Sequence, residues 1–311
     1  MLGPEEKRDP QNRKEYSMSL ENKVVVTCAL TGVLTDPKKF NVPVTPAEMA
    51  AATKEAYDAG ASIVHAHFRS QEPGLAAWPT WDLKPVGEIL AAIREAVPEI
   101  IINMSTGVMG NDLEGPLSCL AAYKPEMAAC NAGSLNYLKI GKTGNWAWPP
   151  ILFDNPVEKV GRFLAVMREN NVAPEFECFD TGIVRSVAMY KAVGMFEGDP
   201  HLSLVMGVDS GMPARADLLD ILKDEMPKDA HWQVIATGPG REKIWDLHRR
   251  ALELGGNVRT GLEDTFYLPD GGKARGNGDL TEALVRLVRE AGKEPATPQE
   301  ARQILKLTPR K

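Results

Sequence analysis

Two histidines separated by one residue give the strongest chemical signal in this sequence. They lie in the short apolar run Ile63-Val64-His65-Ala66-His67-Phe68-Arg69. Because side chains alternate along a strand with a period of two, His65 and His67 would leave the same face with their rings close together. A single histidine of this kind can simply fill a polar part of a core, but two on one face can grip one metal ion. Catalytic zinc usually takes three protein ligands, so this pattern predicts a metal site whose third ligand comes from elsewhere.

A second constellation lies near the end of the chain, in Val258-Arg259-Thr260-Gly261-Leu262-Glu263-Asp264. A guanidinium beside a carboxylate holds it ionised and oriented, which suits a general base next to a metal-polarised substrate. A purely structural salt bridge is the alternative. Glu263 is a candidate third metal ligand, and its alternative role is that of an acidic residue stabilised by a helix N-terminus.

Two loops offer groups that could bind an anion. Ser105-Thr106-Gly107 supplies hydroxyls and backbone N–H groups for a carboxylate or a developing enolate, although the same residues could form an ordinary helix cap. Gly238-Pro239-Gly240-Arg241 resembles a loop that lets phosphate approach the backbone, with Arg241 as its partner. So short a glycine pattern is not specific.

The elements that must position these residues alternate regularly from Lys23 onward. Buried, β-branched runs predict strands, and capped amphipathic runs such as the one opened by Thr45-Pro46-Ala47-Glu48 predict helices. The predicted strands are 24–29, 61–68, 99–104, 127–130, 175–179, 202–206, 232–236 and 257–260, and the predicted helices are 45–60, 83–96, 155–170, 181–193, 215–223, 242–254 and 280–291.

Eight strands in repeated β-then-α order predict a TIM (β/α)8 barrel, with an open doubly wound sheet as the alternative. Each strand is followed by polar residues, and a barrel would gather these on one rim. Closure would bring the eighth strand against the first and near the second, so that Glu263 reaches the two histidines. His201 and His231 would begin strands at the opposite rim, and His248 lies in a helix. The rim assigns substrate binding to Thr106, Gly107, Asn131, Ser134 and Arg241.

Composition narrows the classes of protein and partner. The chain has 311 residues and a formal net charge of -6, which argues against a nucleic-acid or anionic-membrane partner. No apolar run approaches the roughly 20 residues of a membrane-spanning helix. Four widely spaced cysteines predict reduced thiols and a cytoplasmic protein. Residues 1–22 are rich in charge and are expected to form a flexible arm, with residues 23–311 as a single catalytic domain.

Several spaced motifs, in order, resemble the beta-keto acid cleavage enzyme family, over residues 23–305. The marks are Thr31-Gly32, Pro43-Val44-Thr45-Pro46, His65-Ala66-His67-Phe68-Arg69, Ser105-Thr106-Gly107, Lys124-Pro125-Glu126-Met127, Asn131-Ala132-Gly133-Ser134-Leu135-Asn136, Arg259-Thr260-Gly261-Leu262-Glu263-Asp264 and Ala296-Thr297-Pro298.

This resemblance implies a zinc-dependent condensation of a beta-keto acid with acetyl-CoA as co-substrate, followed by retro-Claisen cleavage to acetoacetate and a new acyl-CoA. It implies a homo-oligomer, expected to be a tetramer. Carried over by position, His65, His67 and Glu263 would hold Zn2+, while Asp264, held by Arg259 and Ser105, would act as the base.

One departure from the family concerns the substrate's side group. Family members that cleave an aminohexanoate carry an acidic residue after the first strand's Thr-Gly turn, whereas this turn reads Thr31-Gly32-Val33-Leu34. An ammonium buried beside Leu34 would be unpaired and costly, so we expect a keto acid without a primary amine, unless Asp180 or Asp209 supplies the charge. The alternatives are a metal-dependent hydrolase of the amidohydrolase type, which would need histidines after later strands, and a non-catalytic barrel.

Overall fold

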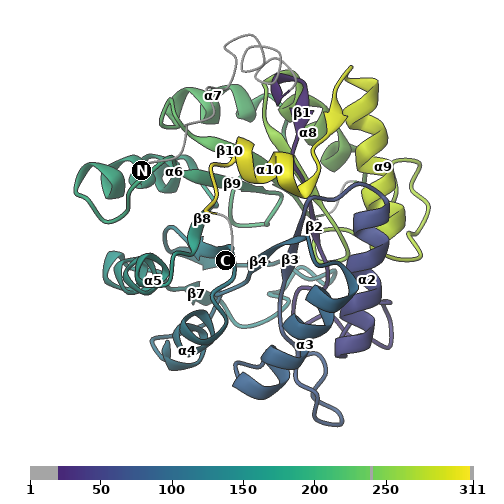
Figure 1. Ribbon diagram of the computed structural model, residues 1–311, viewed down its shortest axis with the longest axis vertical. Helices are drawn as coiled ribbons and strands as arrows, with labels where there is room; N and C mark the ends of the chain where they lie inside the picture. The colour runs from purple at the N-terminus through teal and green to yellow at the C-terminus, as the bar shows by residue number, and fades with distance from the viewer. Residues whose placement is uncertain (1–19, 239–240, 309–311) are drawn as a thin grey trace, which may run out of the picture.

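Eight parallel strands close into a barrel in the computed structural model, which describes residues 20–238 and 241–308. The strands follow one another around the barrel in chain order, and the last strand pairs with the first. Helices surround the strands as an outer ring (Figure 1). The predicted TIM (β/α)8 barrel is therefore confirmed, and the open doubly wound sheet is wrong.

The elements have the following bounds. The barrel strands are β2 (Val26–Ala29), β3 (Ile63–Ala66), β4 (Ile101–Met104), β5 (Met127–Asn131), β8 (Ala173–Cys178), β9 (His201–Met206), β10 (His231–Ala236) and β11 (Asn257–Thr260). The helices are α2 (Pro46–Asp58), α3 (Leu83–Ala96), α4 (Glu114–Tyr123), α5 (Val157–Glu169), α6 (Thr181–Ala192), α7 (Leu218–Glu225), α8 (Arg241–Glu253), α9 (Asn277–Glu290) and α10 (Pro298–Ile304). Two small sheets pair β1 (Lys23–Val24) with β12 (Glu294–Pro295) and β6 (Leu135–Tyr137) with β7 (Ile151–Phe153).

All eight predicted strands are present, and each predicted helix is found within a few residues of its expected ends. The capping box at the start of α2 is confirmed, since the Thr45 hydroxyl accepts from the Glu48 N–H while the Glu48 carboxylate accepts from the Thr45 N–H. Two helices, α4 and α10, were not predicted. The signal for α10 was available, because Thr297 and Glu300 form the same capping box.

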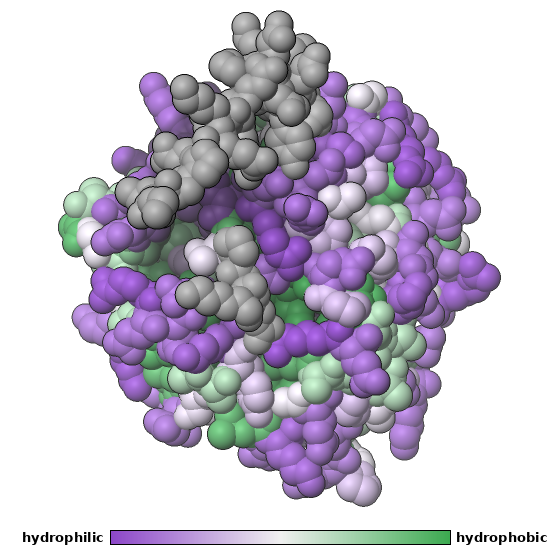
Figure 2. Space-filling view, viewed as in Figure 1, coloured by the Kyte–Doolittle hydropathy of each residue, from purple (hydrophilic) through white to green (hydrophobic). Residues whose placement is uncertain are grey.

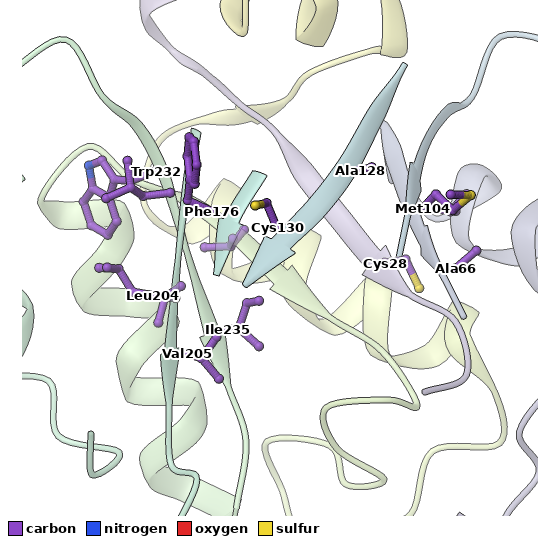
Figure 3. Packing of buried hydrophobic residues seen from close by; sticks show 14 of the residues in the cluster. Cys28, Ala66, Met104, Ala128, Cys130, Phe176, Leu204, Val205, Trp232 and Ile235 are labelled. Carbon is purple, nitrogen blue, oxygen red and sulfur yellow. The ribbon is translucent and has the colours of Figure 1, made fainter. Parts of the chain in front are cut away.

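The strands bury apolar side chains on their outer face, against the helices. Figure 3 shows such residues along the barrel, among them Cys28, Met104 and Phe176. Since side chains alternate along a strand, the residues next to them in sequence point into the barrel. This alternation places Thr27, Asn103 and Glu175 in the barrel interior, where all three are buried.

The end of the barrel where the strands begin is closed by the C-terminal segment. Leu305 and Leu307 form an apolar cluster with residues such as Val25, Ile63 and Ile101. Helix α10 lies across this end of the barrel (Figure 1). The open end of the barrel is therefore the opposite one, where the strands terminate.

The remaining expectations concern the surface and the N-terminal arm. Hydrophilic residues cover most of the helical ring on the face shown in Figure 2, with smaller apolar areas between them. Among the described residues, none of the helices is both long and apolar enough to cross a bilayer. Most of the expected arm, residues 1–19, lies outside the described residues. The arm and the single catalytic domain over residues 23–311 stay predictions.

Candidate active site

The two histidines lie where strand β3 ends, at the rim formed by the carboxyl ends of the strands. His65 belongs to β3 and is 1% exposed, and His67 is the first residue after the strand. Their ring centroids are 5.2 Å apart, with the ring planes at 70°. The period-two spacing therefore brings the rings together as the sequence predicted.

Barrel closure brings Glu263 to the histidines. Strand β11 pairs with β2, and β2 pairs with β3. The chain turns after β11 at Gly261, whose φ of +147° and close approach to β2 exclude a side chain, because a Cβ there would lie 2.1 Å from the Ala29 carbonyl oxygen. The Glu263 N–H then donates to that same Ala29 carbonyl at 3.2 Å. Glycine is thus what allows the loop to pack against β2 and deliver the carboxylate.

The three side chains offer a set of donor atoms that fits one metal ion. Glu263 Oε1 lies 3.7 Å from His65 Nε2 and 3.5 Å from His67 Nε2, and one ligand atom from each residue lies within 4.8 Å of the other two. Ligand atoms bound to a tetrahedral zinc at about 2.0–2.2 Å would be separated by roughly 3.5 Å. Both His65 ring nitrogens and Glu263 Oε2 are buried without a hydrogen-bond partner. These residues therefore fit a zinc ion.

Arg259 is the charged centre beside this donor set. Its guanidinium is 1% exposed and donates to Asp264 through Nε and Nη2, each at 3.0 Å, and to Glu263 Oε1 at 2.5 Å. Its Nη1 lies 3.6 Å from Glu177 Oε1. One buried cation thus orients a carboxylate of the donor set and contacts two further carboxylates.

The charges of these groups follow from burial and from Arg259. Burial lowers the pKa of His65 well below its usual range, which leaves the ring neutral as a metal ligand must be. Burial alone would raise the pKa of Glu263, but Arg259 and the two histidines lower it well below its usual range. Burial raises the pKa of Asp264 to about 6, against the opposing effect of Arg259 and with a contribution from Glu263. Glu263 is therefore ionised, and Asp264 can take up a proton near neutral pH.

The Ser105-Thr106-Gly107 turn lies beside Asn131 on this rim. A Cβ on Gly107 would lie 3.6 Å from Asn131 Nδ2 and 4.0 Å from Ser105 Oγ. The Thr106 hydroxyl donates to the Ala129 carbonyl at 2.6 Å, so it ties the end of β4 to β5. In the part of the chain that the structure describes, the hydrogen bonds to Asp264 side-chain oxygens come from Arg259 and none comes from Ser105. The role of Ser105 in holding the base stays a prediction.

Ser134 and Arg241 are placed differently from the other predicted residues. The Ser134 hydroxyl accepts from the Asn155 N–H at 2.7 Å, which fixes the segment that leads into α5. Arg241 is the first residue of α8, and its side chain lies outside the described residues, as do Pro239 and Gly240. Substrate binding by Ser134, and by Arg241, stays a prediction.

The excursion between β6 and β7 is a hairpin on the same side of the barrel. Trp148 stacks on Tyr137 with ring centroids 5.9 Å apart, and the Leu138 N–H donates to the Ser210 hydroxyl of the loop that follows β9. Ile140 and Trp146 are exposed. The sequence of residues 141–150, with Trp146 and Trp148 before a pair of prolines, predicts a lid or an oligomer contact, and that role stays a prediction.

Two charged residues at the site were given no role from the sequence. Glu177 on β8 lies against Arg259, and burial raises its pKa to about 7. Arg69 follows β3 and is 1% exposed. Its guanidinium donates to the Thr31 hydroxyl and to main-chain carbonyls of Thr31, Gly32, Thr35 and Ala76. The signal for Arg69 was its position two residues after His67 on an otherwise apolar strand.

The loop that Arg69 clamps carries Leu34. A Cβ on Gly32 would lie 2.9 Å from Glu263 Cγ, so this loop packs directly on the metal-ligand candidate. Leu34 itself has φ +66° and is 66% exposed, and its N–H donates to the Ala77 carbonyl. An exposed apolar side chain is therefore held in the loop that packs on Glu263.

The histidines that an amidohydrolase would need do not join this site. His201 and His231 begin β9 and β10, and their stacked rings lie 5.3 Å apart at the opposite end of the barrel. His248 lies in α8, against Trp245. The fold and the site together define a (β/α)8-barrel enzyme with a two-histidine, one-carboxylate donor set and an arginine-held carboxylate.

Comparison with known proteins identifies the family. The sequence profile described as beta-keto acid cleavage enzyme matches residues 23–307, which is nearly the whole chain. The chain belongs to the beta-keto acid cleavage enzyme family, and it is an enzyme that cleaves a carbon–carbon bond. The resemblance drawn from the motifs is thereby confirmed.

Individual relatives extend over the same region. The chain is 35% identical to a 3-keto-5-aminohexanoate cleavage enzyme of Fusobacterium nucleatum, over 92% of this chain and 98% of that protein. It is 32% identical to a 3-oxoadipate:acetyl-CoA acetyltransferase of Cupriavidus necator, over 91% of this chain and 94% of that protein. A solved binary complex of ObcA with oxaloacetate shares the fold, with a TM-score of 0.67, 20% identity, and coverage of 86% of this chain and 68% of that chain.

Proposed function

We propose that this protein is a zinc-dependent enzyme that condenses a beta-keto acid with acetyl-CoA and cleaves the adduct to acetoacetate and a new acyl-CoA. The observation that carries the proposal is the position of Asp264. Its carboxylate is held by two hydrogen bonds from Arg259, directly beside the donor set of His65, His67 and Glu263. A base next to a metal site is what removal of a proton from a carbon between two carbonyls requires.

His65, His67 and Glu263 would hold the zinc ion. The charge states of His65 and Glu263 support this assignment. Burial lowers the pKa of His65, and Arg259 together with the two histidines lowers that of Glu263, so both are in the form that binds a cation. When bound, zinc supplies Lewis-acid stabilisation of an enolate, which makes the proton abstraction accessible at neutral pH.

Asp264 is the base, and Arg259 keeps it in place. The two hydrogen bonds from Arg259 fix the plane of the Asp264 carboxylate. The carboxylate is therefore oriented toward the substrate before the substrate binds. The pKa of Asp264 near 6 gives a carboxylate that is ionised at neutral pH yet basic enough to accept a proton in the transition state.

The bonds made and broken balance as follows. Asp264 takes a proton from the carbon between the two carbonyls, and that carbon forms a bond to the acetyl carbonyl carbon while the CoA thiolate leaves. The thiolate then adds to the distal carbonyl of the original keto acid. The bond between that carbonyl carbon and the central carbon breaks, Asp264 returns the proton, and acetoacetate and the new acyl-CoA are released.

We expect the side group of the keto acid to be apolar, or in any case to lack a primary amine. Leu34 supports this expectation, because it occupies the loop that packs on Glu263 and can offer no counter-charge. Asp180, one of the two carboxylates that might have compensated, caps α6 by accepting from the Ile183 N–H at 2.8 Å. Asp209 remains as the alternative source of charge.

We also propose that the protein is a homo-oligomer, expected to be a tetramer, and that it works in the cytoplasm. Support for the compartment comes from the four cysteines, all of which are free and buried. The exposed Ile140 and Trp146 of the β6–β7 hairpin would suit a contact between subunits.

The proposal is tested with the purified protein, acetyl-CoA and a panel of beta-keto acids, by following acetoacetate with and without a chelator. Asp264→Asn should keep stoichiometric zinc and lose turnover, because the amide cannot accept the proton. His67→Ala should lose the metal. Full turnover in Asp264→Asn, or stoichiometric zinc in His67→Ala, would count against the assigned roles. Metal-dependent ester or amide hydrolysis without any keto acid cleavage would favour the hydrolase.

A further inference from the structure

A layer of polar side chains fills the barrel directly beneath the metal-ligand candidates. TIM barrels pack their interior in layers of four side chains taken from alternate strands, and bulky aliphatic residues dominate these layers. Here, the layer consists of Thr27, Asn103, Glu175 and Gln233, from β2, β4, β8 and β10, and every member is at most 6% exposed. Since buried polar groups are costly unless paired, this layer calls for an explanation.

Hydrogen bonds within the layer fix the orientation of one amide. Asn103 Nδ2 donates to Glu175 Oε2 at 2.7 Å, and Gln233 Nε2 donates to the same oxygen at 3.1 Å. Because Glu175 takes the amide nitrogen of Asn103, the amide oxygen must point away from Glu175. That oxygen, Asn103 Oδ1, is buried and has no partner in the described part of the chain.

The residue that carries the unpartnered oxygen is the neighbour of His65 on the adjacent strand. Asn103 and His65 are directly paired in register across β4 and β3. His65 Nδ1 is likewise buried without a partner among the described residues, whereas Nε2 is the ring atom that lies near Glu263 Oε1. His65 Nδ1, a possible donor, and Asn103 Oδ1, an acceptor, thus belong to paired residues on neighbouring strands, and each lacks another partner among the described residues.

We propose that Asn103 is a positioning residue: its Oδ1 accepts a hydrogen bond from His65 Nδ1–H, and Glu175 holds the Asn103 amide in the orientation that makes this possible. The bond keeps the proton on Nδ1 and leaves Nε2 free to bind the metal. Ligand histidines commonly use their second nitrogen in this way, with a carboxylate or carbonyl as acceptor. This inference rests on the proposed metal site but not on the identity of the keto acid.

The test is the zinc affinity of purified, substrate-free protein, measured by competition with a chromophoric chelator. Loss of such a partner typically weakens metal binding by about 10- to 100-fold, and we expect a loss of that order in Asn103→Ala. Ser203→Ala is the matched control. Ser203 is equally buried and accepts from Gln233 Nε2 at 2.9 Å, but it has no hydrogen bond to Asn103.

Two Glu175 variants guard against a general loss of folding. Glu175→Gln keeps an oxygen that can accept from Asn103, and it should retain zinc affinity within a few-fold. Glu175→Ala removes the acceptor and should weaken zinc binding as Asn103→Ala does. The absorption spectrum of the cobalt-substituted protein should shift in Asn103→Ala and in Glu175→Ala, and stay that of the wild type in Ser203→Ala and Glu175→Gln.

The outcomes separate this inference from the proposed function. Equal zinc affinity in wild type and Asn103→Ala, or equal losses in Asn103→Ala and Ser203→Ala, would overturn the positioning role. A wild-type protein that binds no zinc would overturn it together with the metal site. If Asn103→Ala weakens zinc binding as expected but the wild-type protein cleaves no keto acid, the positioning role of Asn103 is supported and the proposed reaction is refuted.

Discussion

Replacing Arg259 tests whether one buried cation neutralises the site. Arg259→Leu removes a guanidinium that is 1% exposed and lies against Asp264, Glu263 and Glu177. Breaking a buried ion pair by removing one partner costs about 3–5 kcal/mol, because the other charge stays buried and uncompensated. For a chain of 311 residues the loss corresponds to a fall in Tm of roughly 5–8 °C.

The effect has two signatures that a simple packing defect lacks. The difference in unfolding free energy between the wild type and Arg259→Leu should become smaller as the pH falls, because protonated carboxyl groups need no counter-charge. It should also be smaller with zinc present, since a bound cation would neutralise Glu263. The turnover of Arg259→Leu should fall by about 10²- to 10⁴-fold, the range associated with a general base that is no longer correctly placed.

Arg302→Leu is the matched control for this experiment. Arg302 also makes a two-point ion pair, with both nitrogens 2.7 Å from Glu126, but at the closed end of the barrel and with its side chain 20% exposed. Because the Glu126 side chain is 7% exposed, the loss of Arg302 should cost about 1–3 kcal/mol, and it should leave turnover unchanged. The assay is denaturant unfolding with and without zinc, at several pH values. Equal destabilisation of the two variants, independent of pH and zinc, would refute the role given to Arg259.

Three further predictions follow from single residues. Leu34→Glu should raise kcat/KM for an amine-bearing keto acid by about tenfold relative to an apolar one, and an unchanged ratio would remove Leu34 as a specificity residue. Burial lowers the pKa of His248 to about 3, below the value of about 6.5 expected in the unfolded chain. Between about pH 6.5 and about pH 3 the unfolded chain therefore binds a proton that the folded protein does not, so the free energy of unfolding falls as the pH falls. His248→Leu should therefore abolish about 2 kcal/mol of the decline in unfolding free energy between about pH 7 and pH 5, and an unchanged pH profile would contradict this. Gly261→Ala should lower the free energy of unfolding by at least about 1–3 kcal/mol and weaken zinc binding, because the added Cβ would lie 2.1 Å from the Ala29 carbonyl oxygen. If the variant bound zinc as tightly as the wild type, the position of Glu263 would not depend on this turn.

The fold was predictable because its signals are local. Period-two and period-3.6 patterns locate the strands and helices, and their alternation alone indicates the barrel. Closure then places Glu263 beside His65, although 198 residues separate them, because β11 pairs with β2 and β2 with β3. The α4 helix was missed since it has no side-chain cap and carries glycine and proline near its start.

The parts of the site that were missed depend on which neighbours a side chain meets. The Thr106 hydroxyl, which the sequence predicts to bind substrate, also donates to the Ala129 carbonyl, and its role in binding stays a prediction. Asn103 lies in an apolar strand pattern that gives it no role. Its orientation depends on the hydrogen bond to Glu175, which lies 72 residues later on another strand. Such pairings are set by register around the barrel, which no local pattern specifies. Arg69 likewise gains its role from a loop that lies more than thirty residues earlier in the chain.

The reaction itself is tested most directly by following a carbon label. The protein would be incubated with a beta-keto acid and acetyl-CoA labelled with carbon-13 in both acetyl carbons, and the products would be analysed by mass spectrometry. We predict that the label appears in acetoacetate, in its methyl and ketone carbons, while the new acyl-CoA carries none. Label that stays in a CoA thioester or appears as free acetate, with no labelled acetoacetate from any keto acid in the panel, would contradict the proposed function.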